Sequence, residues 1–167
     1  MKSKCVVIGG LSRQDIEKRL AAASVELNDY ARVLLAHKIF DSVSLAEPVN
    51  FASFRLQDLG LRQPATLKTI FERATSRGLA LCPPAAGPYL RLATLDQQNS
   101  VNAVLSAGKN PSDSLTISSL PLGGDDFPKG FYLRVVDGVP WLRGYRCDDA
   151  YEFAPEDAFI FMVPGLG

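Results

Sequence analysis

An Asp-Gly dipeptide at 137–138 joins two stretches, 131–136 and 139–146, that are rich in β-branched and aromatic residues. This pattern predicts a β-hairpin with a two-residue turn. Such a turn sets the pairing register, so Val136 is expected opposite Val139, and side chains alternate between the two faces. One face, which we call the aromatic–arginine face, then collects Tyr132, Arg134, Trp141, Arg143 and Tyr145. The other face collects apolar residues expected in the core: Phe131, Leu133, Val135, Pro140 and Leu142.

The residue types of the aromatic–arginine face are suited to binding a ligand. Trp, Tyr and Arg are enriched in binding hot spots, and this face holds the only Trp of the chain. Its arginines are able to donate charge-assisted hydrogen bonds to an acidic or polar group, while the rings supply rigid contact area. The alternative is structural, because arginine–aromatic pairs also stabilise ordinary half-exposed sheets. We therefore predict a non-catalytic binding module for a peptide, a protein or a small polar ligand.

Carboxylates and arginines in nearby segments suggest an alternative function, that of a small hydrolase-type enzyme. Arg91 lies within an apolar stretch that runs to Leu92, Asp96 comes shortly after it, and both join the candidate ligand-binding residues. The Gly-Asp-Asp sequence at 124–126 and the pair Asp148-Asp149 offer carboxylates for acid–base chemistry. Adjacent Asp residues in turn-rich segments more often serve as turn and cap residues. The sequence therefore assigns no catalytic residue, and it leaves open whether the protein is an enzyme.

The sequence lacks the usual motifs for metals and nucleotide cofactors. The single histidine, His37, excludes a site with two histidine ligands, and Cys5, Cys82 and Cys147 lie too far apart for metal-site spacing. A Gly-Gly pair follows the apolar run 5–8, but the third glycine of a dinucleotide-binding turn is absent, as is a phosphate-binding loop. We predict no metal and no cofactor.

Apolar residues at heptad spacing indicate helix over residues 13–39. They are Ile16, Leu20, Ala23, Leu27, Tyr30, Leu34 and His37. One interpretation is a single helix about 40 Å long. The other is a break within 24–29, where Asn28-Asp29 would cap a second helix. We expect the apolar seam to pack on the chain's own core. Exposure of the seam would favour a third function, that of a structural interaction subunit.

The remaining segments predict an α+β fold. Thr66 and Gly78 bound a central helix, as its N-cap and its left-handed C-terminal residue. The Pro- and Gly-rich stretch 82–92 is interpreted as irregular. Short strands are expected at 5–8, 51–56, 101–105, 115–119 and 159–163. Because helices come first and strands cluster late, we expect an N-terminal helical segment, one central helix and a C-terminal antiparallel β-sheet, in a single domain over 1–167.

Charge and composition narrow the partners. The 167 residues include 18 basic and 18 acidic side chains, whereas nucleic-acid binders usually have a basic excess, so a nucleic-acid partner is not expected. No apolar run reaches the roughly 18 residues of a membrane-spanning helix, and the run after Lys4 is too short for a signal peptide. The odd number of cysteines argues against a secreted disulfide framework. We expect a soluble, cytoplasmic protein with no membrane partner.

Two stretches carry a resemblance to a known group of proteins. The first includes GLALCP at 78–83 and GPYLRL at 87–92, and the second includes DDFPKGFYLR at 125–134, GVPWLRGYR at 138–146 and PEDAFIF at 155–161. The chain resembles a family of small bacterial proteins of unknown function, some of which carry the name helicase. The resemblance implies no activity and no residue roles. Helicase activity is not expected, because the phosphate-binding loop is absent.

Overall fold

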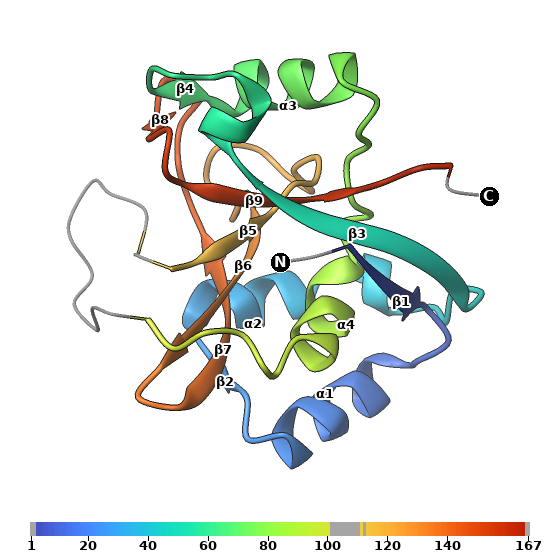
Figure 1. Ribbon diagram of the computed structural model, residues 1–167. Coiled ribbons are helices and arrows are strands. Elements are labelled where there is room, and N and C mark those ends of the chain that lie inside the picture. The colour runs from blue at the N-terminus through green and yellow to red at the C-terminus, as the bar shows by residue number, and fades with distance from the viewer. Residues whose placement is uncertain (1–2, 101–110, 112, 166–167) are drawn as a thin grey trace.

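The computed structural model describes residues 3–100, 111 and 113–165, and most of its strands form one curled sheet (Figure 1). The order across the sheet is β1-β3-β9-β5-β6-β7-β2. These strands are β1 Lys4–Ile8, β3 Glu47–Arg55, β9 Ala158–Met162, β5 Leu115–Ile117, β6 Gly130–Val136, β7 Val139–Tyr145 and β2 Glu26–Leu27. A second sheet pairs β4 (Ala65–Thr66) with β8 (Glu152–Phe153).

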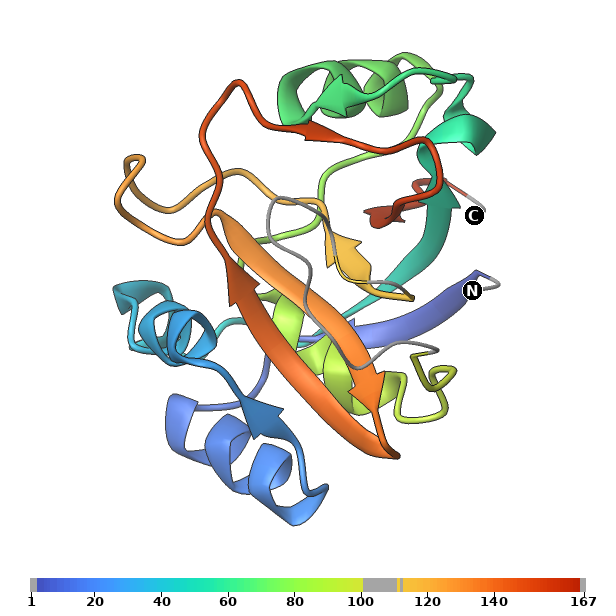
Figure 2. The same cartoon turned by 90° about the vertical axis from the view of Figure 1, so that its left-hand side faces the viewer.

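Helices lie on both sides of the large sheet (Figures 1 and 2). On one side are α1 (Arg13–Ala22), α2 (Asp29–Leu35) and α4 (Ala86–Ala93); on the other are α3 (Leu67–Ser76) and the small sheet. Two short 3-10 turns, η1 (Lys38–Phe40) and η2 (Leu56–Leu59), complete the elements. Each side has its own hydrophobic cluster. Phe131 and Leu133 belong to the cluster with α1, α2 and α4, whereas Phe159 and Phe161 belong to the cluster with α3.

β6 and β7 form a hairpin in the register expected from the Asp-Gly turn. Val136 pairs with Val139, Arg134 with Trp141 and Tyr132 with Arg143. Both turn residues have positive φ, 51° at Asp137 and 76° at Gly138, as a type I′ turn requires. Asn99 supports the turn, because its Oδ1 accepts a hydrogen bond from the Gly138 N–H at 3.0 Å.

The mixed α+β class is confirmed, but the order of elements is not the one expected. β1 and β3 contribute N-terminal strands to the sheet, which is therefore not purely C-terminal. Two neighbouring pairs, β5 with β9 and β2 with β7, are parallel. Segments so far apart in the chain pair without leaving a local pattern in the sequence. The order of helices and strands along the chain therefore did not predict how the sheet is built.

A second central helix, α4, replaces the irregular stretch expected over 82–92. Pro88 lies in its first turn, where a backbone N–H has no partner within the helix, so proline is tolerated there. Gly87 lets the helix approach β6, because a Cβ at this position would lie 2.3 Å from the Phe131 ring. The Gly-Pro pair that suggested a loop is thus part of a closely packed helix, and the expectation of one central helix was wrong.

The N-terminal segment forms two helices with a break between them, which is the second of the two interpretations. α1 ends at Ala22, Ser24 has a positive φ of 57°, and Asn28 caps α2 by accepting from the Ala31 N–H. Ile16, Leu20 and Leu34 of the predicted seam are buried, whereas Tyr30 is 39% exposed. Most of the seam therefore packs within the chain.

The central helix α3 has the predicted ends. Thr66 accepts a hydrogen bond from the Thr69 N–H, and Gly78 has φ of 82°. The Leu79 N–H then bonds to the Ala74 carbonyl, which completes a left-handed helix end. Strands β3, β5 and β9 fall close to the other predicted positions. The strand expected at 101–105 lies outside the described residues.

Candidate ligand-binding face

Arg143 is the centre of the aromatic–arginine face. Its Nε donates to the Tyr132 hydroxyl at 2.7 Å, and its guanidinium carbon lies 4.8 Å from the centroid of the Trp141 ring. The same carbon is 5.9 Å from the Tyr132 centroid. These three residues come together because the turn places Tyr132 directly opposite Arg143, while Trp141 precedes Arg143 by two residues on the same face. The ring and the hydroxyl thereby orient the guanidinium.

The terminal nitrogens of Arg143 have no acidic partner among the described residues. The ion pairs there involve Arg13, Arg32, Lys129 and Arg146. Within the part of the chain that the structure describes, the Arg143 guanidinium donates its hydrogen bond through Nε. Trp141 and Arg143 are both partly exposed. The face therefore presents an oriented cation beside an aromatic ring, and no described carboxylate pairs with its terminal N–H groups.

Arg134 lies on the same face but is buried, with 2% of its surface exposed. Its Nε and Nη2 donate to the Ser100 hydroxyl at 3.2 and 3.1 Å. Burial lowers the pKa of Arg134; the charge of Arg143 lowers it further, while Tyr132 and Asp113 act in the opposite direction. Arg134 therefore lies near the positive charge of Arg143, and its own donors already bond to Ser100.

Tyr145 is partly buried and packs against the hydrophobic cluster around α3. Its ring meets those of Tyr132 and Phe153 edge-on, each at a centroid distance of 6.4 Å. Burial raises the pKa of its hydroxyl. Tyr145 therefore links the aromatic–arginine face to the hydrophobic cluster around α3.

Arg91 does not join Tyr132 and Arg143. It lies on α4, is fully buried, and donates to backbone carbonyls of Arg134 (3.4 Å), Trp141 (3.0 Å) and Thr94 (2.7 Å). Burial lowers its pKa to about 10, and the charge of Asp96 partly offsets this effect. Asp96 itself is exposed. Arg91 thus supports the hairpin backbone from the helix side, and among the described residues no hydrogen bond or ion pair joins Arg91 or Asp96 to Arg143.

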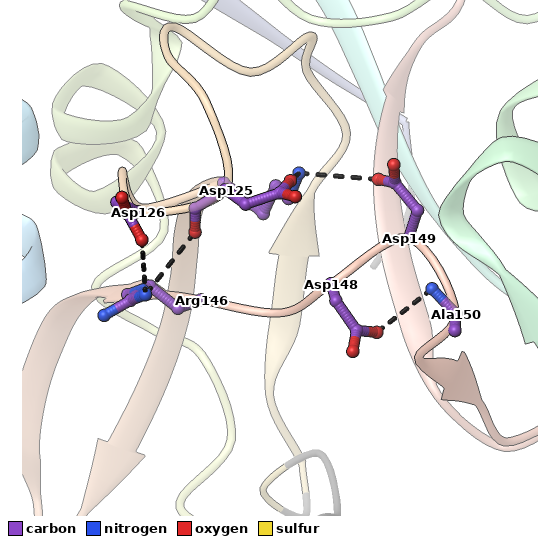
Figure 3. A network of polar contacts seen from close by, with 7 residues as sticks. Asp125, Asp126, Arg146, Asp148, Asp149 and Ala150 are labelled. Atoms are coloured by element: carbon purple, nitrogen blue, oxygen red, sulfur yellow. Dashed lines mark hydrogen bonds and ion pairs between the residues drawn. The ribbon is translucent and has the colours of Figure 1, made fainter.

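The Gly-Asp-Asp loop forms a separate ion-pair network with the second Asp pair (Figure 3). Lys129, 8% exposed, lies 3.3 Å from Asp125 and 3.5 Å from Asp149. Burial acts to lower the Lys129 pKa, but hydrogen bonds to the two carboxylates and their charges outweigh it, so the pKa is raised. Arg146 pairs with Asp126 at 3.7 Å. The acids tie two loops together, and Asp148 accepts from the Ala150 N–H as a turn residue.

Three structural roles had no clear signal in the sequence. Lys129 precedes a strand like any exposed lysine, and only tertiary contacts bury it. Asn99 and Ser100 reach the hairpin from a loop whose composition indicates nothing more than a turn. His37 caps η1 through Nδ1 and packs edge-on against Phe127, with ring centroids 5.8 Å apart.

Within residues 3–100, 111 and 113–165, no group of three or more His, Cys, Asp or Glu side chains is placed to hold a metal ion. No helix in this part of the chain has the length and apolar character needed to cross a membrane. A cavity of about 430 Å³ lies between residues 60–66, Thr69 and Glu152, away from every predicted site residue.

Comparison of the chain with protein-family models, curated proteins and solved structures found no match. The resemblance to small bacterial proteins therefore stays a prediction.

Proposed function

We propose that the protein is a non-catalytic binding module whose ligand contacts Arg143 and Trp141 on the aromatic–arginine face. The observation that supports this most directly is the set of contacts made by the Arg143 side chain. Its guanidinium is held by Tyr132 and stacked near Trp141, yet no described carboxylate pairs with it. A cation oriented in this way needs little further ordering when a ligand binds.

The other two predicted functions have less support. Arg91 and Asp96 lie apart from Arg143, and the Gly-Asp-Asp carboxylates are engaged in ion pairs between loops. Most residues of the N-terminal seam are buried or pack against the core of the chain. Neither arrangement favours an enzyme or a helix-mediated interaction subunit over a binding face.

Trp141 provides a direct test because it is the only Trp of the chain. Tryptophan fluorescence of the purified protein would be followed while pools of peptides and small polar metabolites are added. We expect at least one pool to change the signal of the wild type, and Arg143→Ala to abolish that change with little loss of thermal stability. Arg19→Ala removes an exposed charge from α1, away from the aromatic–arginine face, and should bind as the wild type does.

The opposite result is equally distinct. If Arg143→Ala lowers the melting temperature markedly and no pool affects wild-type fluorescence, the stack of Arg143 and Trp141 is a structural pair. The binding-module function would then be rejected.

A further inference from the structure

The number of accessible charges on the aromatic–arginine face limits the kind of anion it can bind. Three guanidinium groups lie at the hairpin: Arg134 and Arg143 on this face, and Arg91 against the hairpin backbone from α4. Arg91 is fully buried and Arg134 is 2% exposed, so neither offers a surface for an incoming ligand. Arg143 is the partly exposed member of the three.

The two buried arginines also donate hydrogen bonds within the chain, and the charge of a carboxylate acts on each. Arg91 donates to three carbonyl oxygens and feels the charge of Asp96. Arg134 donates to Ser100 and feels the charge of Asp113. Arg143 has Tyr132 and Trp141 as neighbours, and neither carries a formal charge at neutral pH.

The hydrogen bond from Nε to Tyr132 determines which N–H groups of Arg143 remain for a ligand. Because Nε is bonded to Tyr132, the terminal Nη groups are the pair that no carboxylate of the described residues engages. Two parallel N–H donors of one guanidinium match the two oxygens of a single carboxylate. A phosphate dianion, by contrast, carries nearly two charges and is commonly held by a cluster of arginines.

The sheet edge next to this face is already occupied. β2 pairs with β7 at Trp141 and Leu142, and Asn28 bonds to the backbone of Gly144. A peptide therefore has no free run of β7 backbone to pair with as an added strand. Its recognition must come from side chains that meet the face, with an apolar group against the Trp141 ring.

From these observations, and resting on the proposed function, we infer that the ligand of this face is a single carboxylate with a neighbouring apolar side chain, as in an acidic peptide. The carboxylate is bound end-on by the terminal nitrogens of Arg143. The apolar side chain packs beside Trp141.

Four capped dipeptides test the inference: acetyl-Leu-Asp-amide, its neutral counterpart acetyl-Leu-Asn-amide, acetyl-Leu-phosphoserine-amide, and acetyl-Leu-Gly with a free C-terminal carboxylate. Binding is followed by NMR through the Arg143 Nε–H and Trp141 indole N–H signals, which report weak complexes. The Asp peptide should bind about tenfold more tightly than the Asn peptide, as expected for a charge-assisted bond. The free C-terminal peptide distinguishes a terminal carboxylate from a side-chain one as the preferred source.

The variant Arg143→Gln should bring the Asp-to-Asn affinity ratio close to one. Should that variant fold poorly, salt gives a second measurement on the wild type. Added salt should weaken binding of the Asp peptide and leave the Asn peptide unchanged, because exposed charge pairs are screened.

Equal affinity for the Asp and Asn peptides, or a clear preference for the phosphoserine peptide, would overturn the carboxylate assignment. In either case the peptides would still shift the Trp141 signal, so the binding module would stand. If no dipeptide shifts either signal, the carboxylate assignment fails, and the broader pool titration decides the proposed function separately.

Discussion

The side-chain amide of Asn28 pairs with the backbone of Gly144, 116 residues further along the chain. Nδ2 donates to the Gly144 carbonyl at 2.9 Å, and Oδ1 accepts from the Gly144 N–H at 2.8 Å. The same Oδ1 accepts from the Ala31 N–H at the start of α2. A Cβ on residue 144 would lie 2.7 Å from the Tyr30 carbonyl carbon, so glycine is what allows α2 to come this close. One side chain thus joins a helix cap to the edge of the hairpin.

Asn28→Ala should destabilise the protein by about 3 kcal/mol, because it removes a helix cap and leaves the Gly144 backbone groups unpaired. Urea denaturation would measure the change. Ser12→Ala is the matched control, since Ser12 caps α1 through one hydrogen bond and should cost only about 1 kcal/mol. Equal losses in the two variants would show that the bonds to Gly144 contribute nothing.

Gly87→Ala should destabilise the protein by roughly 1–3 kcal/mol, because the added Cβ would overlap the Phe131 ring and push α4 from β6. The helix propensity of alanine acts in the opposite direction, by up to about 1 kcal/mol, but is smaller than the steric cost. Gly124→Ala, where no atom lies within 4 Å of the new Cβ, serves as the control in thermal denaturation. A Gly87→Ala protein as stable as the wild type would contradict the close helix–strand contact.

Arg91→Met should cost about 2 kcal/mol, because methionine fills similar space but donates no hydrogen bond to the three carbonyls that Arg91 contacts. The Trp141 fluorescence should also change, since one of those carbonyls belongs to Trp141. A fully stable variant with unaltered fluorescence would mean that Arg91 is not a support of the hairpin.

Lys129→Met should destabilise the protein by about 1 kcal/mol at neutral pH, a modest loss because Asp125 and Asp149 are largely exposed. The folded-state pKa of Lys129 is raised, so its contribution is complete below the ordinary value of 10.5 and is lost as pH rises through the folded value. The stability gap between wild type and Lys129→Met should therefore close above pH 10.5, measured by urea denaturation across the alkaline range.

Arg146→Met is the control for this series, since its ion pair with Asp126 is exposed on both sides and should leave stability unchanged. A gap between wild type and Lys129→Met that does not depend on alkaline pH would indicate a packing effect of the lysine stem instead.

Local chemistry explains which features could be predicted from the residues alone. The Asp137-Gly138 turn determines the register of β6 and β7, and a register determines which side chains share a face. Thr66 and Gly78 act on α3 through backbone groups within one helical turn. The composition of the aromatic–arginine face was predictable for the same reason, because it depends only on contacts between neighbouring strands.

Long-range packing decided the rest. Arg91 and Arg143 look alike in the sequence, but α4 buries the first against carbonyl oxygens while the second stays partly exposed beside Trp141. Lys129 is buried only because two loops meet around it. β1 pairs with β3 and β5 pairs with β9, although the local sequence patterns of these segments give no indication of which strand each will pair with. Residue types and turn chemistry therefore determined which groups are available for binding, whereas the tertiary structure decided which of them solvent and a ligand can reach, since burial depends on packing between distant parts of the chain.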